Sequence, residues 1–408
     1  MTSRYESLDR GQLATLLPEL LLAGQLIDRS AMAWCIQAFG REEMVRIAIE
    51  EWMASSPVYT RRMQRALGYE GDDVITIFKG LQLDIGAPPQ FMDFRYTVHD
   101  RWHGEFHLDH CGALMDVEPM GENYVRSMCH DIEDPTFDAT AVATNPRAQV
   151  RPVHRPPRTP ADRNPHCAWT VTIDPAHPPV SETAECRRMR GSLAALVELD
   201  PIDPTEHGRS DYSGPLLSDL PFAEFSRSAL VRVVDEVCLQ MHLLNTAFVR
   251  AVHRRVDDDR ARELCVKQLV GIAGIVAERL HRALLLPRGV EGALRVLELH
   301  PLLNPAAYVT AAVDGAVSVR ASPAHEDSAW ISLCGPAETR PLQAIVRAVD
   351  EHLDVDVAGT ATEWTARVVR REDPAEECEE VAVTRVSTGA AFVFEPRTTI
   401  PLTPVRSR

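Results

Sequence analysis

The first 86 residues carry apolar side chains at the spacing of amphipathic helices. Leucines recur every three or four positions between residues 13 and 21, although Pro18 is expected to kink or restart that helix. Further apolar stripes run from about Arg41 to Ser55, from Pro57 to Gly68 and from Asp72 to Gly86. The N-terminal part of the chain is therefore predicted to be helical.

From Phe91 the spacing of apolar residues changes from helical to alternating. The alternation from Met92 to His99 predicts a half-buried strand, and a turn near residues 100–104 leads into a returning strand at Glu105–Cys111. The side chains expected on the polar face of the returning strand are Glu105, His107, Asp109 and Cys111, while His110 falls on the apolar face with Phe106 and Leu108.

The following residues change between short periodic stretches and proline-rich ones. Residues 121–134 are predicted to form a short helix that ends at Pro135. Residues 145–179 contain nine prolines, so we expect an extended, stiff segment rather than a long helix or a central strand. Within this segment, Cys167–Ile173 alternates again and is predicted to be a strand.

The same patterns divide the chain into five parts. We expect a helical, then α+β site domain at 1–175, a linker or wrapping loop rich in proline, aspartate and serine at 176–220, a helical segment at 221–298, a small α+β module at 299–395 and a loose tail at 396–408. In the module, strands are expected at 308–321, 329–334, 355–371 and 381–395, around a helix at 341–353. The predicted fold class is α+β: a helical N-terminal region leads into a small antiparallel sheet, followed by a central helical segment and the C-terminal module.

Length, charge and composition exclude several classes of protein. The chain has 408 residues, a formal net charge of −16 and a hydrophobic share of 45%, as expected for a folded protein of two or three domains. The acidic balance argues against a nucleic-acid partner and against an anionic membrane surface. Because the chain has no apolar run of about 20 residues and no signal pattern, we expect a cytoplasmic protein whose nine cysteines are reduced thiols or ligands. The sequence is also compatible with a homo-oligomer.

Residues capable of chemistry crowd one stretch of the chain. Eight of the fifteen histidines lie between His99 and His177, and three of the nine cysteines fall in the same stretch. The most basic segment of this acidic chain, residues 145–158, lies there too. A reaction site, if the protein has one, is therefore expected in this window.

A metal site is one interpretation of this window. Zinc and iron are held by thiolate, imidazole and carboxylate groups that converge to within about 2.0–2.3 Å of the ion. The candidate ligands are His107, Asp109, Cys111, Cys129, His130 and Asp131. The Cys-x2-Cys pair and the His-Glu-x-x-His helix of common zinc sites are absent, as is the Cys-x-x-Cys-His motif of covalent haem, so haem is the less favoured cofactor. We assign Glu50 and Glu51, on a predicted helix, to a solvated face rather than to a metal site.

Catalysis by a thiol is a second interpretation. Cys111 is the candidate nucleophile because its neighbours on the predicted strand are polar, whereas the other two cysteines of this window lie on apolar faces, where a cysteine behaves as a small hydrophobe. A base such as His107, His110 or His130 would have to lie within hydrogen-bond reach of the thiol. His110 and His130 are also the candidate groups for general proton transfer.

Three arginines form a candidate anion-binding site. Arg147, Arg151 and Arg155 are four residues apart in a segment that proline keeps extended, so they share one face of the chain. Their guanidinium groups suit a clamp on a carboxylate or a phosphate. The alternative, to which we give equal weight, is that they pair with a nearby acidic patch made of Asp131, Glu133, Asp134 and Asp138.

The order of these features resembles that of the L-2-amino-thiazoline-4-carboxylic acid hydrolase-like superfamily and related uncharacterised bacterial families. The resemblance covers about residues 10–175 and depends on a helical first half, a cysteine after a strand (Gly104–Cys111), a cysteine followed by an acid (Cys129–Asp131) and a final Cys-x-Trp strand (Cys167–Trp169). The chain departs from this pattern in its histidine-rich stretches and in everything after residue 220. The resemblance implies ring-opening hydrolysis of a small carboxylated molecule.

Two hypotheses of function follow from the sequence. The first is an enzyme, metal-assisted and possibly a hydrolase, that acts on a small anionic molecule held by Arg151 and Arg155, with His130 or His110 transferring the proton. The second is a non-catalytic protein that senses a small molecule, a metal or haem and passes the signal on through its C-terminal module.

Overall fold

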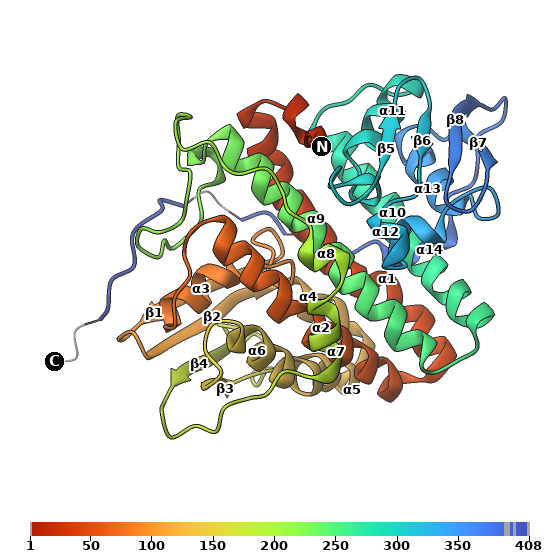
Figure 1. Ribbon diagram of the computed structural model, residues 1–408. Helices are drawn as coiled ribbons and strands as arrows, with labels where there is room; N and C mark the ends of the chain where they lie inside the picture. Colours follow the sequence, from red (N-terminus) through yellow and green to blue (C-terminus); the bar gives the residue numbers. More distant parts are fainter. Residues whose placement is uncertain (1, 387–391, 395–396, 406–408) are drawn as a thin grey trace.

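Four long helices form the middle of the molecule (Figure 1). They are α1 (Arg10–Phe39), α2 (Arg41–Ala66), α9 (Arg227–His253) and α10 (Asp258–Ala283). Helix α9 packs against both α1 and α2, and α10 packs against α1. This computed structural model describes residues 2–386, 392–394 and 397–405.

Local signals explain where these helices begin but not how far they run. Asp9 caps α1 and Ser226 caps α9 through side-chain oxygens that accept backbone N–H groups of the first turn. A restart of the helix at Pro18 and the start of a new helix at Pro57 are both wrong, because both prolines lie inside continuous helices. Each of these helices is buried along much of its length, and this packing offsets the hydrogen bond that a proline removes.

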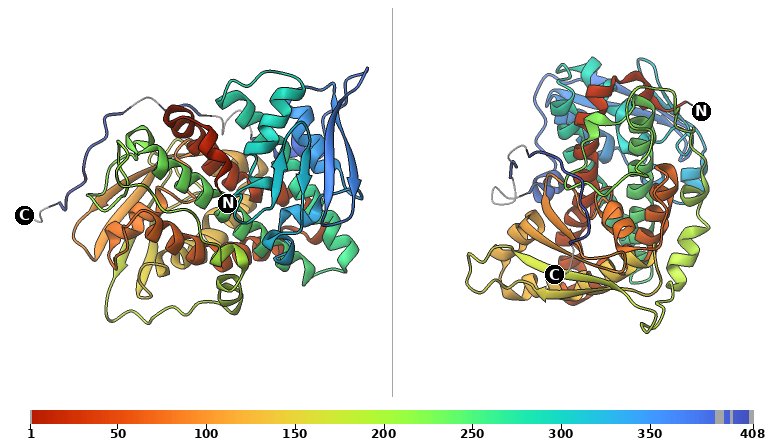
Figure 2. Two further views of the ribbon diagram at one scale, coloured as in Figure 1. Left: turned by 45° about the horizontal axis from the view of Figure 1, so that its top comes forward. Right: turned by 90° about the vertical axis from the view of Figure 1, so that its left-hand side faces the viewer.

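A four-stranded antiparallel sheet lies on one side of the long helices (Figures 1 and 2). Its strands are β1 (Met92–Val98), β2 (His103–Cys111), β3 (Ala148–His154) and β4 (Cys167–Ile173), in the order β1-β2-β4-β3. The alternating patterns predicted β1, β2 and β4. Strand β3 lies at the edge of the sheet, where its proline breaks no ladder between two neighbours.

Aromatic side chains cover the face of this sheet that points into the protein, which we call the inner face. The ring of Phe106 in β2 has four aromatic neighbours, at centroid distances of 5.3–6.5 Å. These neighbours are Phe94 of β1, Trp169 of β4, Phe78 of α3 (Val74–Leu81) and Phe137 of α6 (Glu133–Val142). The inner face is therefore held against both α3 and α6 by the residues that the strand pattern assigned to the core.

Short helical turns connect β2 to β3. They are α4 (Gly112–Val117), a 3-10 turn (Glu118–Met120), α5 (Glu122–Arg126), a π-helix (Ser127–Ile132) and then α6. The predicted helix at 121–134 is present, but it continues past Pro135 to Val142. Pro135 thus lies inside a helical run that passes without a break from the π-helix into α6.

The segment expected to be a linker or a wrapping loop packs against the long helices. It contains α7 (Ala184–Arg190) and α8 (Leu193–Leu196), and both contact α2 and α9. The described residues of the tail expected to be loose are also hydrogen-bonded. Leu402 N donates to Leu216 O at 2.7 Å, and Val405 N donates to Val98 O at 2.8 Å. Backbone pairing of this kind has no signature in the composition of a short tail.

The C-terminal module contains a second antiparallel sheet of four strands. These are β5 (Ala311–Val313), β6 (Val317–Val319), β7 (Leu353–Gly359) and β8 (Trp364–Arg370), in the order β5-β6-β8-β7, with α11 (Val290–Leu299), α12 (Pro323–Glu326), α13 (Arg340–Val349) and α14 (Glu379–Thr384) around them. Helix α10 packs on α13 and α14, which attaches the module to the long helices.

Two of the strands expected in this module differ in the described residues. Residues 330–333 form a 3-10 helix, and residues 381–384 of the strand expected at 381–395 lie in α14, whereas 387–391 and 395 of that strand lie outside the described residues. The three consecutive residues Ala329, Trp330 and Ile331 are all buried, so the apolar run there does not have the period of a strand. The α+β class and the helical N-terminal region are confirmed. Among the described residues, no helix combines the length and the apolar character needed to cross a membrane.

Candidate functional site

Two of the predicted metal ligands lie on the outer face of the sheet, opposite the aromatic cluster. His107 and Asp109 are half-exposed there, and His107 Nε2 lies 3.4 Å from Asp109 Oδ1. Their orientation follows from the alternation of side chains along β2.

The two predicted thiol ligands point into the protein. Cys111 ends β2 and caps α4, where its sulfur accepts a hydrogen bond from Leu114 N at 3.4 Å. Cys111 and Cys129 are 5% and 3% exposed. Burial raises the pKa of the Cys111 thiol to about 12 and that of Cys129 well above its usual value. Both groups are therefore protonated thiols near neutral pH, whereas attack and metal binding need a thiolate.

The remaining two predicted ligands lie in the π-helix. His130 Nε2 is bonded to the backbone carbonyl oxygen of Pro156 at 2.6 Å, and Asp131 is exposed. The six predicted ligands thus belong to three different surroundings and do not form one ligand set. The physical reason is that the chain turns inward at the end of β2, which separates Cys111 from the polar face of its own strand.

A different trio of side chains comes together instead. Within the described ranges, the group of three histidine, cysteine or acidic residues whose ligand atoms all lie within 4.8 Å of one another is His99, His103 and Glu105. None of the three was a predicted ligand, although Glu105 was expected on the polar face of the returning strand.

The candidate proton-transfer residue His110 is buried on the inner side of β2. Its ring stacks on Phe392 with a centroid distance of 4.2 Å. Burial lowers the pKa of His110, so its imidazole is neutral near pH 7. In the described part of the chain, its Nε2 atom has no hydrogen-bond partner, and Cys111 forms no hydrogen bond with a histidine.

The three arginines of the proposed anion clamp have partners within the protein. Arg147 donates to the backbone carbonyl oxygens of Pro175 and His177, Arg151 pairs with Asp138 at 2.9 Å, and Arg155 pairs with Asp134. Arg151 and Arg155 thus follow the alternative reading, in which they pair with the acidic patch. Each arginine has its own acceptors, and the three guanidinium groups are not gathered around one position.

A mostly apolar pocket lies between the inner face of the sheet and helices α1, α2 and α6. We call it the inner pocket; its volume is about 90 Å³. Its larger apolar lining residues are Trp52, Leu81, Met92, Phe94, Leu108, Met128, Ile132 and Phe137. The polar groups that could orient a molecule there come from Gln25, Asp28, Asp84 and Glu133. Apolar walls with a few polar groups are typical of small-molecule sites.

Glu133 is the most unusual of these polar groups. It is the first residue of α6, and its half-buried side chain borders the pocket. Burial raises its pKa to about 8, which the charge of Asp134 supports and that of Arg155 opposes. Its Oε2 atom is shielded from solvent and has no hydrogen-bond partner among the residues described. The carboxyl group is therefore protonated at neutral pH and close to its titration point.

Two further carboxyl groups face one another behind the pocket. Asp28 lines the pocket from α1 and accepts a hydrogen bond from Trp52 Nε1, and Glu51 of α2 lies against Asp28. Burial raises the pKa of both, that of Glu51 the more, because the charge of Asp28 adds to it. Asp28 Oδ1 and Glu51 Oε2 have no hydrogen-bond donor among the described residues. A proton shared between the two carboxyl groups supplies the missing donor. The assignment of Glu51 to a solvated face is wrong, since it is 2% exposed.

Asp84 completes the set of buried acids. It accepts hydrogen bonds from Tyr59 at 2.8 Å and from Gly86 N at 2.7 Å. Burial raises its pKa to about 6, and these two hydrogen bonds limit the rise. Asp84 therefore has its donors within the protein, which suits a residue that fixes the pocket wall. Glu133 Oε2 and Gln25 Oε1 have no hydrogen-bond donor among the described residues, which suits groups that face a bound molecule.

The π-helix brings Met128 and Ile132 to the pocket immediately before Glu133. A π-turn inserts one residue into a helical register, and such turns occur frequently at functional sites. Val125, Cys129 and Ile132 of this segment are buried, and Met128 is half-buried.

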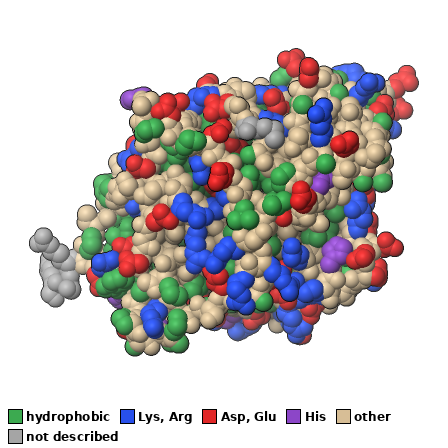
Figure 3. Space-filling view, in the orientation of Figure 1, with side chains coloured by type: hydrophobic (Ala, Val, Ile, Leu, Met, Phe, Trp, Pro, Cys, Tyr) green, Lys and Arg blue, Asp and Glu red, His purple; other side chains and the backbone are tan. Residues whose placement is uncertain are grey.

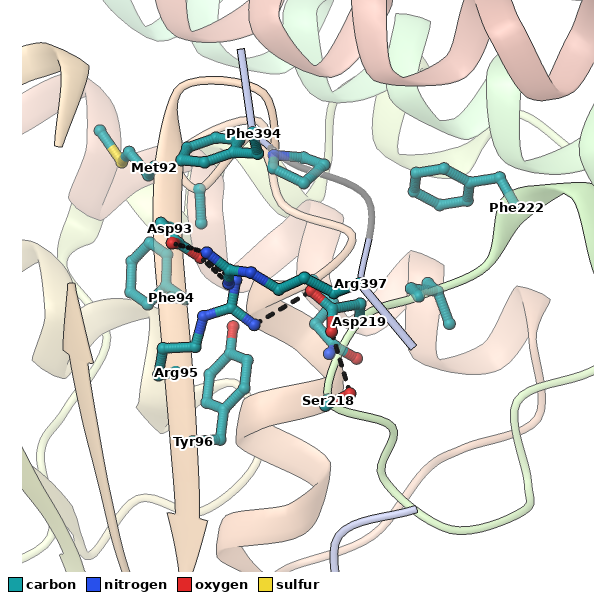
Figure 4. Close-up of a pocket in the computed structure, with 14 residues that line it drawn as sticks. Met92, Asp93, Phe94, Arg95, Tyr96, Ser218, Asp219, Phe222, Phe394 and Arg397 are labelled. Atoms are coloured by element: carbon teal, nitrogen blue, oxygen red, sulfur yellow. Dashed lines mark hydrogen bonds and ion pairs between the residues drawn. The ribbon is translucent and has the colours of Figure 1, made fainter. Parts of the chain in front are cut away.

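A second pocket of about 170 Å³ lies beside the first, along the free edge of β1 (Figure 4). We call it the outer pocket. It shares Ala87, Met92 and Phe94 with the inner pocket, so these side chains form the wall between the two. Asp93 accepts from both Arg95 and Arg397, and Arg95 also pairs with Asp219 at 3.1 Å (Figure 4). The two basic groups of this pocket are thus balanced by two carboxylates.

Basic side chains gather over the middle of the face in Figure 3. Arginines of α2 and α7, both of which cross that face, line an open groove of about 800 Å³ together with Glu182. Glu182 pairs with Arg61 at 2.7 Å and also with Arg190. The charged side chains of this groove therefore form ion pairs that join α7 to α2.

Two of the acids that border or back the inner pocket have a local signal in the sequence: Glu51 stands next to Trp52, and Asp84 lies between Leu83 and Ile85. An acid next to large apolar residues is the signal that could have found these two. Glu133 was named only as part of an acidic patch.

Comparisons with models of known protein families, with curated proteins and with solved structures find no match to this chain. The resemblance to the hydrolase-like superfamily therefore stays a prediction.

Proposed function

We propose that this protein is an enzyme of the general acid–base type. It takes a small, largely apolar molecule with a basic nitrogen into the inner pocket, and Glu133 exchanges a proton with that molecule. The observation that carries the proposal is the Glu133 carboxyl group, which borders an apolar pocket with an unpartnered oxygen and a pKa raised to about 8. A group that transfers protons efficiently has a pKa near the working pH.

The polar lining of the pocket supports a ligand that offers hydrogen-bond donors. Gln25 Oε1 and Glu133 Oε2 can each accept a hydrogen bond, and neither has a donor among the described residues. An amine that takes the proton of Glu133 becomes an ammonium group opposite a carboxylate. The resulting charge-assisted hydrogen bonds are worth about 1.5–3 kcal/mol each.

A carboxylate-bearing substrate fits this pocket less well than the sequence analysis expected. The described residues that line the inner pocket include three acids and no arginine or lysine. An anion would therefore meet carboxyl groups without a balancing charge. Burial raises the pKa of the Cys111 and Cys167 thiols, which disfavours a cysteine nucleophile. Proton transfer by Glu133 is therefore the chemistry that we propose.

A matched set of ligands tests the preference for an amine. Phenethylamine, phenethyl alcohol and phenylpropionate share an aromatic ring and differ in the terminal group. We expect phenethylamine to raise the melting temperature of the protein most, and its affinity to fall about ten- to a hundred-fold in Glu133→Gln. Binding of the alcohol should change little in that variant. Glu122→Gln, on the exposed side of α5, is the matched control.

Two outcomes would contradict the proposal. If phenylpropionate raised the melting temperature most, the preferred ligand would be an anion, as the sequence analysis expected. If the affinity for phenethylamine were unchanged in Glu133→Gln, Glu133 would not belong to the binding site.

A second experiment distinguishes an enzyme from a binding protein. A small-molecule cell extract is incubated with wild-type protein or with Glu133→Gln, and its NMR spectrum is followed over time. We expect signals that change only with the wild type. Amine binding without any such change would identify a non-catalytic binding protein.

A further inference from the structure

We propose that His99, His103 and Glu105 bind a divalent transition-metal ion on the outer face of the sheet, at the tip of the β1–β2 hairpin. This site is separate from the inner pocket and uses none of its residues. The ligand set is two imidazoles and one carboxylate, and the ligand atoms already lie within 4.8 Å of one another.

The hairpin places the three side chains on one face. His99 follows the last residue of β1 and His103 begins β2, and His99 N donates to His103 O at 3.0 Å. The two imidazole rings lie side by side, with centroids 4.7 Å apart. Glu105 is two residues beyond His103, and alternation along β2 returns it to the same face.

The ligand atoms of the three side chains lie close to one another. His99 Nε2 lies 3.2 Å from Glu105 Oε1. That nitrogen is shielded from solvent, and no described residue gives it a hydrogen bond of acceptable geometry. A metal ion between the ring nitrogens and the carboxylate would use the lone pair that the protein leaves free.

Hydrogen bonds within the protein hold the backbone of the turn without a metal ion. Asp100 N also donates to His103 O, at 3.1 Å, and Asp100 Oδ1 accepts from Trp102 N at 2.7 Å. Trp102 O in turn accepts from Ile173 N of β4 at 2.8 Å. Ligands of a tetrahedral zinc ion at its usual bond lengths are about 3.3 Å apart. The ligand atoms, which lie within 4.8 Å of one another, would therefore have to approach by at most about 1.5 Å, and rotation of the half-exposed side chains can supply this.

The donor types identify the class of ion. Two imidazoles and a carboxylate suit zinc and its first-row neighbours and suit magnesium or calcium poorly, since those ions prefer oxygen ligands. Three protein ligands leave at least one coordination position open to water or to another molecule. The neighbouring His107–Asp109 pair lies on the same face but supplies only two ligand atoms, which makes it a matched control.

The test uses tag-free, full-length protein. Zinc affinity is measured by competition with a chromophoric chelator, and the coordination of cobalt(II) by its visible absorption. We expect one zinc ion per chain at this site and an affinity at least about ten-fold weaker in His99→Ala and in His103→Ala. Glu105→Gln should weaken binding in the same direction, and His107→Ala should bind zinc as the wild type does.

Melting temperatures of all variants without metal show that they remain folded, which is expected because the substituted side chains are half-exposed. Zinc affinity unchanged in the His99→Ala/His103→Ala double variant would overturn the proposal. So would an equal loss in His107→Ala, which would move the site along the strand. A wild-type dissociation constant weaker than about 100 μM would likewise reject a dedicated site.

Discussion

The two faces of the first sheet carry the same kinds of side chain in opposite surroundings. On the outer face, His103, Glu105 and His107 alternate along β2 and remain in contact with water. On the inner side, Glu133 and Asp28 border an apolar pocket, and burial raises the pKa of both. The comparison shows that residue type alone does not decide the chemistry of a group. Loss of water turns an acid into a proton donor, whereas a solvated group keeps its lone pairs available to an ion.

The same contrast separates the two proposals. The proposed metal site depends on three ligand atoms that a hairpin brings together on half-exposed side chains. The inner pocket depends on one carboxyl group, of which one oxygen is shielded from water. Substitutions that compare neighbouring positions on the two faces therefore test whether the difference in surroundings is real.

The largest effect is expected for adjacent residues of β2. Phe106→Ala removes the ring at the centre of the aromatic cluster and should lower the free energy of unfolding by about 3–5 kcal/mol. His107→Ala, the next residue but on the outer face, should change it by less than about 0.5 kcal/mol. Chemical denaturation of both variants measures the difference. Similar losses would mean that the two faces are not distinguished by packing.

A smaller effect is expected in the pH dependence of stability. The folded-state pKa of Glu133 is about 8, above the value of about 4.3 for an exposed glutamate. Between these values the folded protein binds more protons than the unfolded chain, so its stability falls as the pH rises, and the loss is complete above pH 8. Glu133→Gln should remove this loss and gain roughly 2–4 kcal/mol at pH 9, after allowance for hydration from the pocket.

The matched outer-face variant is Glu105→Gln, whose stability should follow that of the wild type across the same pH range. Thermal unfolding from pH 5 to pH 9 provides the measurement. If wild type and Glu133→Gln showed parallel curves, Glu133 would be ionised in the folded protein, and the proposed proton donor would be lost.

The smallest effect concerns the buried thiols. Cys111→Ala and Cys129→Ala each remove a small buried side chain and should cost about 1–2 kcal/mol. Neither lines the inner pocket, so ligand-induced stabilisation should be unchanged in both. A loss of ligand response or of turnover in Cys111→Ala, with Cys129→Ala normal, would restore Cys111 as the nucleophile that the sequence suggested.

The sequence by itself determined the α+β class, the position of the first hairpin and the face on which His107 and Asp109 lie. These features follow from the spacing of apolar residues over a few positions, and that spacing is contained in the chain. Only the tertiary structure decided that Cys111 turns inward, that Arg155 pairs with Asp134, and that Asp28 meets Glu51 across two helices. The pKa of a carboxyl group and the ligand set of an ion depend on groups from distant parts of the chain and on the exclusion of water. Local spacing encodes neither.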